Sequence, residues 1–172
     1  MTQTTVYVDG NTLSPQEVAM VADQRAKVAV SDDAWPRIHA ARSVVDRIVS
    51  TGETVYGINT GFGALVHERI SSEDIAQLQL NLIRSHATAL GDPMDAESVR
   101  AMMLIRLNSL CKGHSGIHPD CINQLVDFLN HGIHPHVPRI GSLGASGDLA
   151  PLSHLALAMI GEGKVLTEDA FV

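Results

Sequence analysis

Apolar residues recur at helical spacing along most of this chain, and the pattern predicts six helices. The first helix begins at Ser14, with proline at the next position and Glu17 three residues after the cap, which is the pattern of a capping box. It is expected to end near residue 25. The others are expected from Asp32 or Asp33 to Gly52, from Ser71 or Ser72, from near Asp95 to Gly113, from Pro119 to Gly132, and from Asp148 to about Ile160.

Strand patterns are short. Thr4–Val8 alternates and ends at Asp9-Gly10, which predicts a hairpin-type turn. A short strand or extended piece is expected at residues 54–56, and Pro135 and Pro138 predict an extended stretch. Residues 57–63 include three glycines and are expected to form a loop. The pattern therefore predicts a mainly α fold with a few short strands and glycine-rich loops, in one domain over residues 1–172.

The last predicted helix, LAPLSHLALAMI, is apolar on nearly every side. Such a helix is normally buried all round. Little sequence follows it that could cover it, which indicates that the chain acts as part of something larger.

Composition narrows the function classes. The chain is 45% hydrophobic and 18% charged, and 12 basic against 19 acidic residues leave a net charge of −7. A basic face for nucleic acid is not expected. No signal peptide or membrane-spanning run is evident, so no membrane partner is expected. Cys111 and Cys121 match no zinc or redox spacing, and we interpret them as reduced core residues of a cytoplasmic protein.

The most informative segment is the glycine-rich loop 141–148, GSLGASGD. It lacks the GK[ST] and GxGxxG patterns of phosphate loops, and Asp148 would place a negative charge beside a phosphate. It also misses the GxSxG nucleophile elbow by one residue. A plain reading remains open, in which the glycines permit a tight turn and Asp148 caps the following helix.

A further interpretation uses the chemistry of Ala145-Ser146-Gly147 itself. In a tightly bent backbone, the Gly147 nitrogen can attack the Ala145 carbonyl carbon, and loss of water closes a five-membered ring. A second dehydration removes the Ser146 hydroxyl and leaves an exocyclic methylene. Glycine offers an unhindered nitrogen and serine a leaving hydroxyl. The product would be an electrophile made from the chain, a task that a bound cofactor performs in other enzymes.

GSLGASGDLAPLSHLA closely resembles the signature of the aromatic amino acid ammonia-lyases. TVYGINTGFGAL resembles a mobile loop of that family, and LNLIRSHATALG resembles its segment that contacts the substrate ring. NSLCKGHSGIHPD and the approach HPHVPRIGSLGASG are also similar, so the resemblance extends over about residues 9–163. It implies the helical fold of this lyase group, within the fumarase/aspartase-like superfamily, and a cytoplasmic homotetramer.

The resemblance also implies roles for individual residues. Ala145, Ser146 and Gly147 would form 4-methylidene-imidazol-5-one autocatalytically, with Ser146 supplying the dehydroalanine-derived carbon and with no external cofactor. Tyr56 would be the base that removes the β-proton, although beside a glycine turn it could simply be a packing aromatic. His86 and Gly63 would contact the substrate, a free amino acid that is a small molecule.

The family eliminates ammonia from an α-amino acid to give an α,β-unsaturated acid. Histidine lyases resemble Ser-His at the Ser85-His86 pair, and some tyrosine aminomutases share it. A histidine suits a polar ring that forms a hydrogen bond. The resemblance therefore favours elimination of ammonia from L-histidine to give urocanate, in histidine degradation. A tyrosine ammonia-lyase or aminomutase is the alternative, and an ordinary helix histidine is the alternative for His86.

Nine histidines invite a metal interpretation, and His134 and His136 would share a face in an extended segment. No carboxylate or cysteine joins them at ligand spacing, so no metal is expected.

Members of the resembled family are much longer, and their downstream part supplies further substrate-binding residues. The resemblance therefore implies that this chain corresponds to the N-terminal portion of a lyase, which would need further copies or a complementary chain. One alternative is a catalytically inactive fragment or helical association module with an unreacted loop. Another is a serine hydrolase that uses Ser146, although no oriented base is evident.

Overall fold

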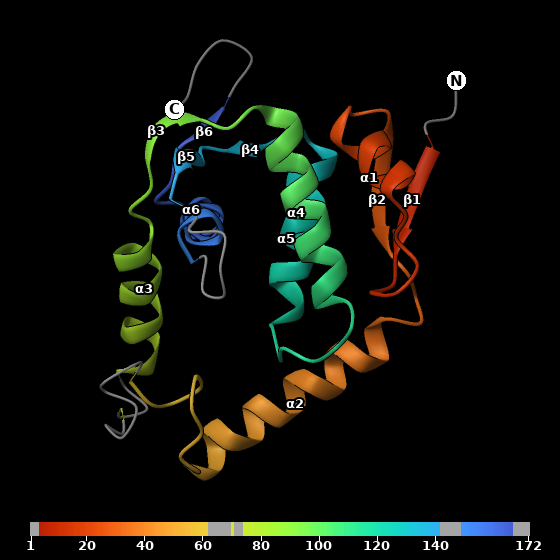
Figure 1. Cartoon of the computed structure of the whole chain (residues 1–172). Coiled ribbons are helices and arrows are strands. Elements are labelled where there is room, and N and C mark those ends of the chain that lie inside the picture. The colour runs from red at the N-terminus through yellow and green to blue at the C-terminus, as the bar shows by residue number, and fades with distance from the viewer. Residues whose placement is uncertain (1–3, 62–69, 71–73, 142–148, 167–172) are drawn as a thin grey trace.

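The fold begins with two parallel strands joined by a helix (Figure 1). The computed structural model describes residues 4–61, 70, 74–141 and 149–166. Strand β1 (Thr4–Val8) pairs in parallel with β2 (Ala26–Val30), and α1 (Pro15–Ala22) connects them. The capping box predicted at the start of α1 is confirmed. The predicted hairpin is wrong, because the chain passes through α1 before it returns beside β1.

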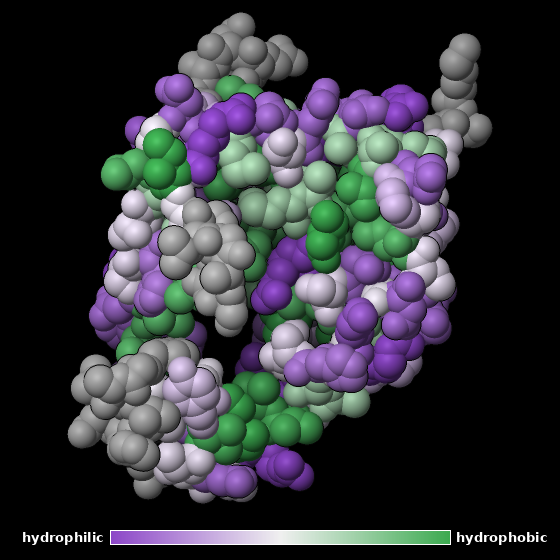
Figure 2. All heavy atoms as spheres, in the orientation of Figure 1, coloured by the Kyte–Doolittle hydropathy of each residue, from purple (hydrophilic) through white to green (hydrophobic). Residues whose placement is uncertain are grey.

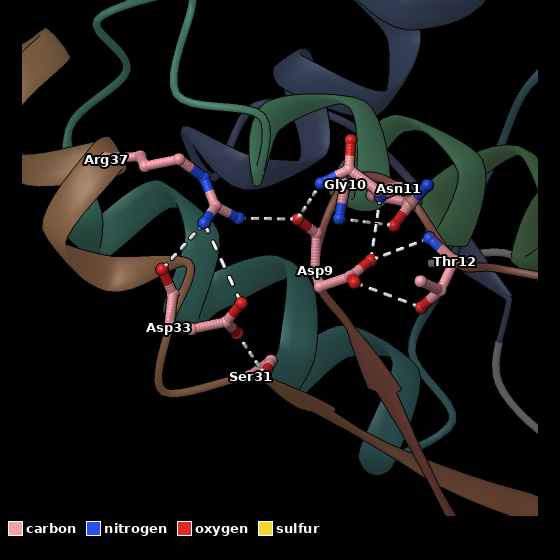
Figure 3. A network of polar contacts seen from close by, with 8 residues as sticks. Asp9, Gly10, Asn11, Thr12, Ser31, Asp33 and Arg37 are labelled. Carbon is pink, nitrogen blue, oxygen red and sulfur yellow. Dashed lines mark hydrogen bonds and ion pairs between the residues drawn. The ribbon is translucent and has the colours of Figure 1, made fainter.

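The turn after β1 is held by polar contacts (Figure 3). The Asp9 carboxylate accepts hydrogen bonds from the backbone N–H groups of Asn11 and Thr12, at 2.7 and 2.8 Å. Arg37 Nη2 donates to the Asp9 carbonyl at 2.8 Å. Gly10 N–H donates to Asn108 Oδ1 at 2.9 Å. These bonds join the end of β1 to two helices that are distant in the sequence.

Helices α4 (Ala96–Leu110) and α5 (Pro119–Asn130) pack against each other at the centre of the core. Helix α1 covers α4, and β2 packs against α5. Both helices begin where the sequence predicts, since Asp95 caps α4 and His118 caps α5. Their inward positions and the strands form one buried cluster, whose fully buried members include Val8, Ile38, Met103, Leu104, Leu107 and Ile122.

Helix α2 (Trp35–Thr51) crosses one end of this core (Figure 1). It ends at Gly52, which has a left-handed φ of 68° as the predicted stop requires. The predicted start at Asp32 or Asp33 is wrong. The N-cap is Ala34, which makes no side-chain capping bond, while the Asp33 side chain accepts from Ser31 and pairs with Arg37.

A second layer contains α3 (Ile75–His86) and α6 (Leu149–Met159), which pack against each other. Strand β3 (Leu90–Pro93) pairs antiparallel with β5 (Pro138–Ile140), and β4 (His134–Pro135) pairs with β6 (Val165–Leu166). The predicted extended stretch around the two prolines is confirmed. The starts predicted at Ser71 or Ser72 and at Asp148 lie outside the described residues.

Helix α6 is not buried on every side in this chain, as expected from the little sequence available to cover it. Leu155 is the one buried residue among its described positions, because α3 and β4 cover only part of its surface. Figure 2 shows apolar side chains on this face of the molecule, on both sides of a hollow between the α3 side and the α4–α5 pair. Exposed apolar side chains of this layer include Leu90, Ile140 and Leu149.

Both cysteines are free thiols, but only one belongs to the core. Cys111 is fully buried, and burial raises its pKa to about 11. Cys121 is only partly buried, so the prediction that both are core residues is wrong for it. Among the described residues, no helix is long and apolar enough to span a membrane.

Candidate active site

Tyr56 lies in a turn that follows α2, and its side chain is 60% exposed. Asn59, which is 97% buried, holds this turn through its side chain. Its Oδ1 accepts from the backbone N–H of Val55 at 2.9 Å, and its Nδ2 donates to the Glu53 carbonyl at 2.6 Å. The strand or extended piece predicted at residues 54–56 is therefore irregular backbone that ends in a turn. Asn59 fixes the backbone just before Tyr56.

The turn lines a cleft of about 430 Å³. It is lined by Gly57 and Ile58 from the turn and by Ile75 and Gln79 from the first turns of α3. Tyr56 is therefore close to the N-terminal end of α3.

His86 is the last residue of α3, at the opposite end of the helix. Its Nδ1 lies 2.8 Å from the Leu82 carbonyl oxygen, which also accepts from Ser85 Oγ at 3.0 Å. A carbonyl can only accept, so Nδ1 bears the proton, and in a neutral ring Nε2 is the acceptor. The Ser85-His86 pair therefore offers a half-buried imidazole whose second nitrogen can accept a hydrogen bond.

The backbone just after His86 is tied to both sides of the glycine-rich loop. Strand β3 pairs with β5, so Leu90 lies opposite Ile140, immediately before the loop. A Cβ atom placed on Gly141 would lie 2.4 Å from the Ala89 Cβ, so this close approach requires glycine. On the other side of the loop, His154 Nε2 in α6 accepts from the Ala89 N–H at 3.2 Å.

The surroundings of His154 favour its neutral form, which is the form that can accept this hydrogen bond. Burial, and then the charge of His136, lower the pKa of His154 below its usual value. The neutral ring can accept at Nε2, whereas the protonated ring cannot. Ala89 is thus held between Gly141, the first residue of the loop, and α6, the helix that follows the loop.

Only some of the predicted site residues lie in the part of the chain that the structure describes. Ala145, Ser146, Gly147 and Gly63 lie outside the described residues. His86 lies three residues before Ala89, which contacts Gly141 at the start of the glycine-rich loop and His154 in the helix that follows it. Tyr56 does not lie near Ala89, because the 12 residues of α3, from Ile75 to His86, separate its two ends by roughly 16 Å. Within the described part of one chain, Tyr56 and His86 do not come together.

Two further residues contribute to this arrangement and were not predicted from the sequence. Asn59 stands among the glycines of GINTG, where a polar residue is ordinary for a loop, so its burial gave no signal. His154 is the one ionisable side chain in a helix that is apolar except for the neighbouring Ser153, and that isolation was a usable signal. Among the described residues, no group of three or more His, Cys, Asp or Glu side chains could hold a metal ion.

Comparisons with known proteins identify the family of this chain. The family model for aromatic amino acid lyase matches residues 13–172. The chain belongs to the aromatic amino acid lyase family. Histidine ammonia-lyase of Staphylococcus aureus (strain bovine RF122 / ET3-1) is 53% identical over 162 residues, which cover 94% of this chain and 32% of that protein.

Solved structures of the lyase family share the fold. Histidine ammonia-lyase from Trypanosoma cruzi matches with a TM-score of 0.88 at 42% identity, over 98% of this chain and 32% of that one. Tyrosine aminomutase from Streptomyces globisporus matches with a TM-score of 0.90 at 39% identity, over 97% and 31%. These matches confirm the predicted mainly helical lyase fold. The chain spans about a third of the length of the curated relatives it matches.

Proposed function

We propose that this chain supplies the N-terminal part of a histidine ammonia-lyase, which eliminates ammonia from L-histidine to give urocanate in histidine degradation. The observation that supports this most is the position of Ser85-His86, fastened through Ala89 to both sides of the Ala145-Ser146-Gly147 sequence. The identity to the S. aureus enzyme favours histidine as substrate.

The chain's own residues fit a 4-methylidene-imidazol-5-one formed at Ala145–Gly147. The backbone at Gly141 lies so close to Ala89 that a Cβ at position 141 would not fit. Helix α6 begins directly after the loop. Both features restrain the ends of a segment that must bend tightly to cyclise. When formed, this group supplies an electrophile for the substrate's amino group. A helix N-terminus beside the loop favours the negative charge that develops there.

In this proposal His86 orients the substrate ring. Its Nε2 can accept a hydrogen bond from an imidazole N–H, while Nδ1 is held by the Leu82 carbonyl. A phenol O–H could donate to the same atom. In this proposal Gly63 also contacts the substrate, as the resemblance of its motif implies. The tyrosine alternative therefore stands, supported by the likeness to a tyrosine aminomutase.

Tyr56 takes the β-proton of the substrate in this proposal. Because α3 separates Tyr56 from His86 within one chain, we infer that the Tyr56 serving one loop belongs to another copy. A homotetramer, or assembly with a complementary chain, would meet this requirement, and it would also cover α6. The two free thiols suit a cytoplasmic location. We infer that residues 1–172 form one domain, because a single apolar cluster joins β1 to α6.

Intact mass is the first test. Loss of two water molecules, mapped by fragmentation to Ala145–Gly147, supports the proposal. An unmodified mass would favour an inactive fragment or helical association module with an unreacted loop. Labelling of Ser146 by an acylating probe would instead support a serine hydrolase.

Activity is tested by replacing the matching 162 residues of the S. aureus enzyme with those of this chain. We expect urocanate from L-histidine and little elimination from L-tyrosine. Ser146→Ala should abolish the reaction, and Ser153→Ala, on α6, is the matched control. If Ser146→Ala keeps the full rate, the lyase proposal is wrong. If tyrosine is the better substrate, the alternative is correct.

Sharing of the site between copies has its own test. Inactive Tyr56→Phe and Ser146→Ala versions of the hybrid enzyme are unfolded and refolded together. Recovery of activity in the mixture supports a site built from two copies. No recovery, with mixed oligomers present, would show that one chain provides both residues.

A further inference from the structure

Arg100 of α4 is a buried cation without a carboxylate partner among the described residues. It is 98% buried. Its Nε donates to the Val21 carbonyl and its Nη1 to the Leu129 carbonyl, both at 2.9 Å. These bonds use two of the five N–H donors, and both acceptors are uncharged. A guanidinium stays protonated even when buried, so its charge needs a counter-charge or solvent.

A small polar cavity lies against Arg100. Its volume is about 60 Å³, which is room for a few water-sized spheres. Gln24, Lys27, Asn130 and Gly132 are among the other residues that line it. Lys27 and Gln24 are exposed, so the cavity extends from the surface down to the buried guanidinium. It has no acidic lining residue, although the chain as a whole has a net charge of −7.

Gln24 adopts a strained backbone at the mouth of this cavity. Its φ is +59°, and among the described residues no other non-glycine residue has a positive φ. The position follows the end of α1, where Arg25 N–H returns to the Met20 carbonyl at 2.9 Å and glycine is the usual occupant. A side chain is kept here in spite of the backbone strain that the left-handed conformation imposes. Such strain often marks a position where the side chain has a task.

His134 of β4 is a second buried polar side chain near this cavity, and one of its nitrogen atoms has no hydrogen-bond partner. It is 92% buried, and its Nε2 has no hydrogen-bond partner. Its Cε1 and the Gln24 Oε1 both lie 3.8 Å from the position of a Cβ on Gly132. Burial, and then the charge of Arg100, lower the pKa of His134. The positive field of Arg100 therefore reaches the buried ring.

We propose that this cavity is a binding site for a small monovalent inorganic anion of the chloride class, between the Arg100 guanidinium and the side chains of Lys27 and Gln24. The anion would neutralise the buried charge and join the end of α1, β2 and the end of α5. It would thereby brace the core on the face away from the α3–α6 layer. This inference does not depend on the proposed lyase activity.

Thermal unfolding of the 172-residue chain tests the proposal at constant ionic strength, with gluconate replaced stepwise by chloride. Gluconate is too large for the cavity. We expect a saturable rise in the melting temperature of roughly 3–6 °C when chloride reaches about ten times its dissociation constant. A melting temperature that is the same in both salts overturns the proposal and indicates that water fills the cavity.

Two exposed substitutions with equal change in net charge make the test site-specific. Lys27→Met should weaken the chloride response several-fold, whereas Arg47→Met, on exposed α2, should leave it unchanged. Equal responses would show a general salt effect and contradict the site. Gln24→Gly should raise the melting temperature in gluconate, because it relieves the strain, and should reduce the gain from chloride.

Bromide gives a direct readout. Crystals soaked in sodium bromide should show an anomalous peak within hydrogen-bonding distance of the Arg100 guanidinium. Nitrate and phosphate arms of the melting series distinguish a halide from an oxyanion. Bromide peaks confined to surface positions, with none in this cavity, would refute the assignment.

Discussion

The α4–α5 core and the α3–α6 layer are stabilised in different ways. Six residues of α4 are buried, whereas none of α3 is and only Leu155 of α6 is. The layer is joined by polar and backbone contacts instead, such as the Ala89–His154 bond and the Arg84 pair with Glu162, where Arg84 Nε lies 2.7 Å from a carboxylate oxygen. The candidate site is thus built on the part of the chain with the least buried apolar surface.

This difference indicates that the site layer gains less stability from apolar burial than the core does. Burial of apolar area is the main source of stability, and α3 and α6 gain little of it here. Regions with few buried contacts open more easily than the core. Contacts supplied by other copies or by a complementary chain would stabilise the layer, in keeping with the proposed assembly.

The largest effect is expected from a cavity in the core. Leu107→Ala should lower the free energy of unfolding by about 2–5 kcal/mol, because Leu107 is fully buried in α4. Leu78→Ala, on partly buried α3, is the matched change in the other layer and should cost much less. Denaturant unfolding measures both. Similar losses would show that the two regions unfold as one equally packed unit.

Gly141→Ala should be the next largest, because its Cβ would lie 2.4 Å from the Ala89 Cβ. We expect a loss of about 1–3 kcal/mol from overpacking and loss of cyclisation at Ala145–Gly147, measured by unfolding and by intact mass. Gly161→Ala is the comparison for cyclisation: its Cβ would meet nothing within 4 Å, and its φ of +79° adds backbone strain only, so it should lower stability and still lose two waters. A Gly141→Ala protein that still loses two waters would show that the close approach is unnecessary for ring formation.

Asn59→Ala should act on the Tyr56 turn. It removes two hydrogen bonds from a buried side chain and leaves the Glu53 carbonyl and Val55 N–H without that partner, at a cost of about 1–3 kcal/mol. In the hybrid lyase, kcat should fall more than KM rises. Exposed Asn81→Ala on α3 provides the comparison. An unchanged kcat would show that the hydrogen bonds of Asn59 are not needed to position Tyr56 for catalysis.

The smallest effect concerns the pH dependence of the Ala89–His154 bond. The folded pKa of His154 is lowered, so the unfolded chain binds the proton first as the pH falls. This contribution to stability is complete above the unfolded value near 6.5 and declines as the pH falls through the folded pKa. His134 has the same sign. His154→Gln keeps an acceptor without titrating, so the slope of stability against pH below 6.5 should become smaller.

The Ala89 amide reports this bond directly. Its NMR shift should titrate with His154 in the original chain and stay constant in His154→Gln. An Ala89 shift that ignores pH in both proteins would mean that protonation of His154 leaves the segment in place.

Local signals in the sequence predicted most helix boundaries, because caps and stops act within one turn. Ser14, Asp95 and Gly52 function as predicted. The hairpin at Asp9-Gly10 failed because strand direction depends on a distant partner, and β2 was missed altogether. The predicted cap of α2 was wrong because the Asp33 carboxylate instead pairs with Arg37 and accepts a hydrogen bond from Ser31.

The candidate site shows the same division. Tyr56 and His86 could be named from the motifs that contain them, yet their separation by the length of α3 is a property of the fold. The link from Ala89 to Gly141 and His154 joins residues far apart in sequence, so no local pattern contains it. The roles of Ala145, Ser146, Gly147 and Gly63 remain predictions.

The pairing of Leu90 with Ile140 also sets an order of events during synthesis. The β1–α1–β2 unit can form as soon as its residues leave the ribosome, whereas β3 must wait for β5, which follows fifty positions later. Closing so long a loop is entropically costly and slow compared with local folding. Under the proposed chemistry, the nascent chain would keep an unreacted Ser146 until β3 pairs with β5. Maturation would then be the last step of folding, and a chain that has not yet cyclised would form its helices before it loses any water.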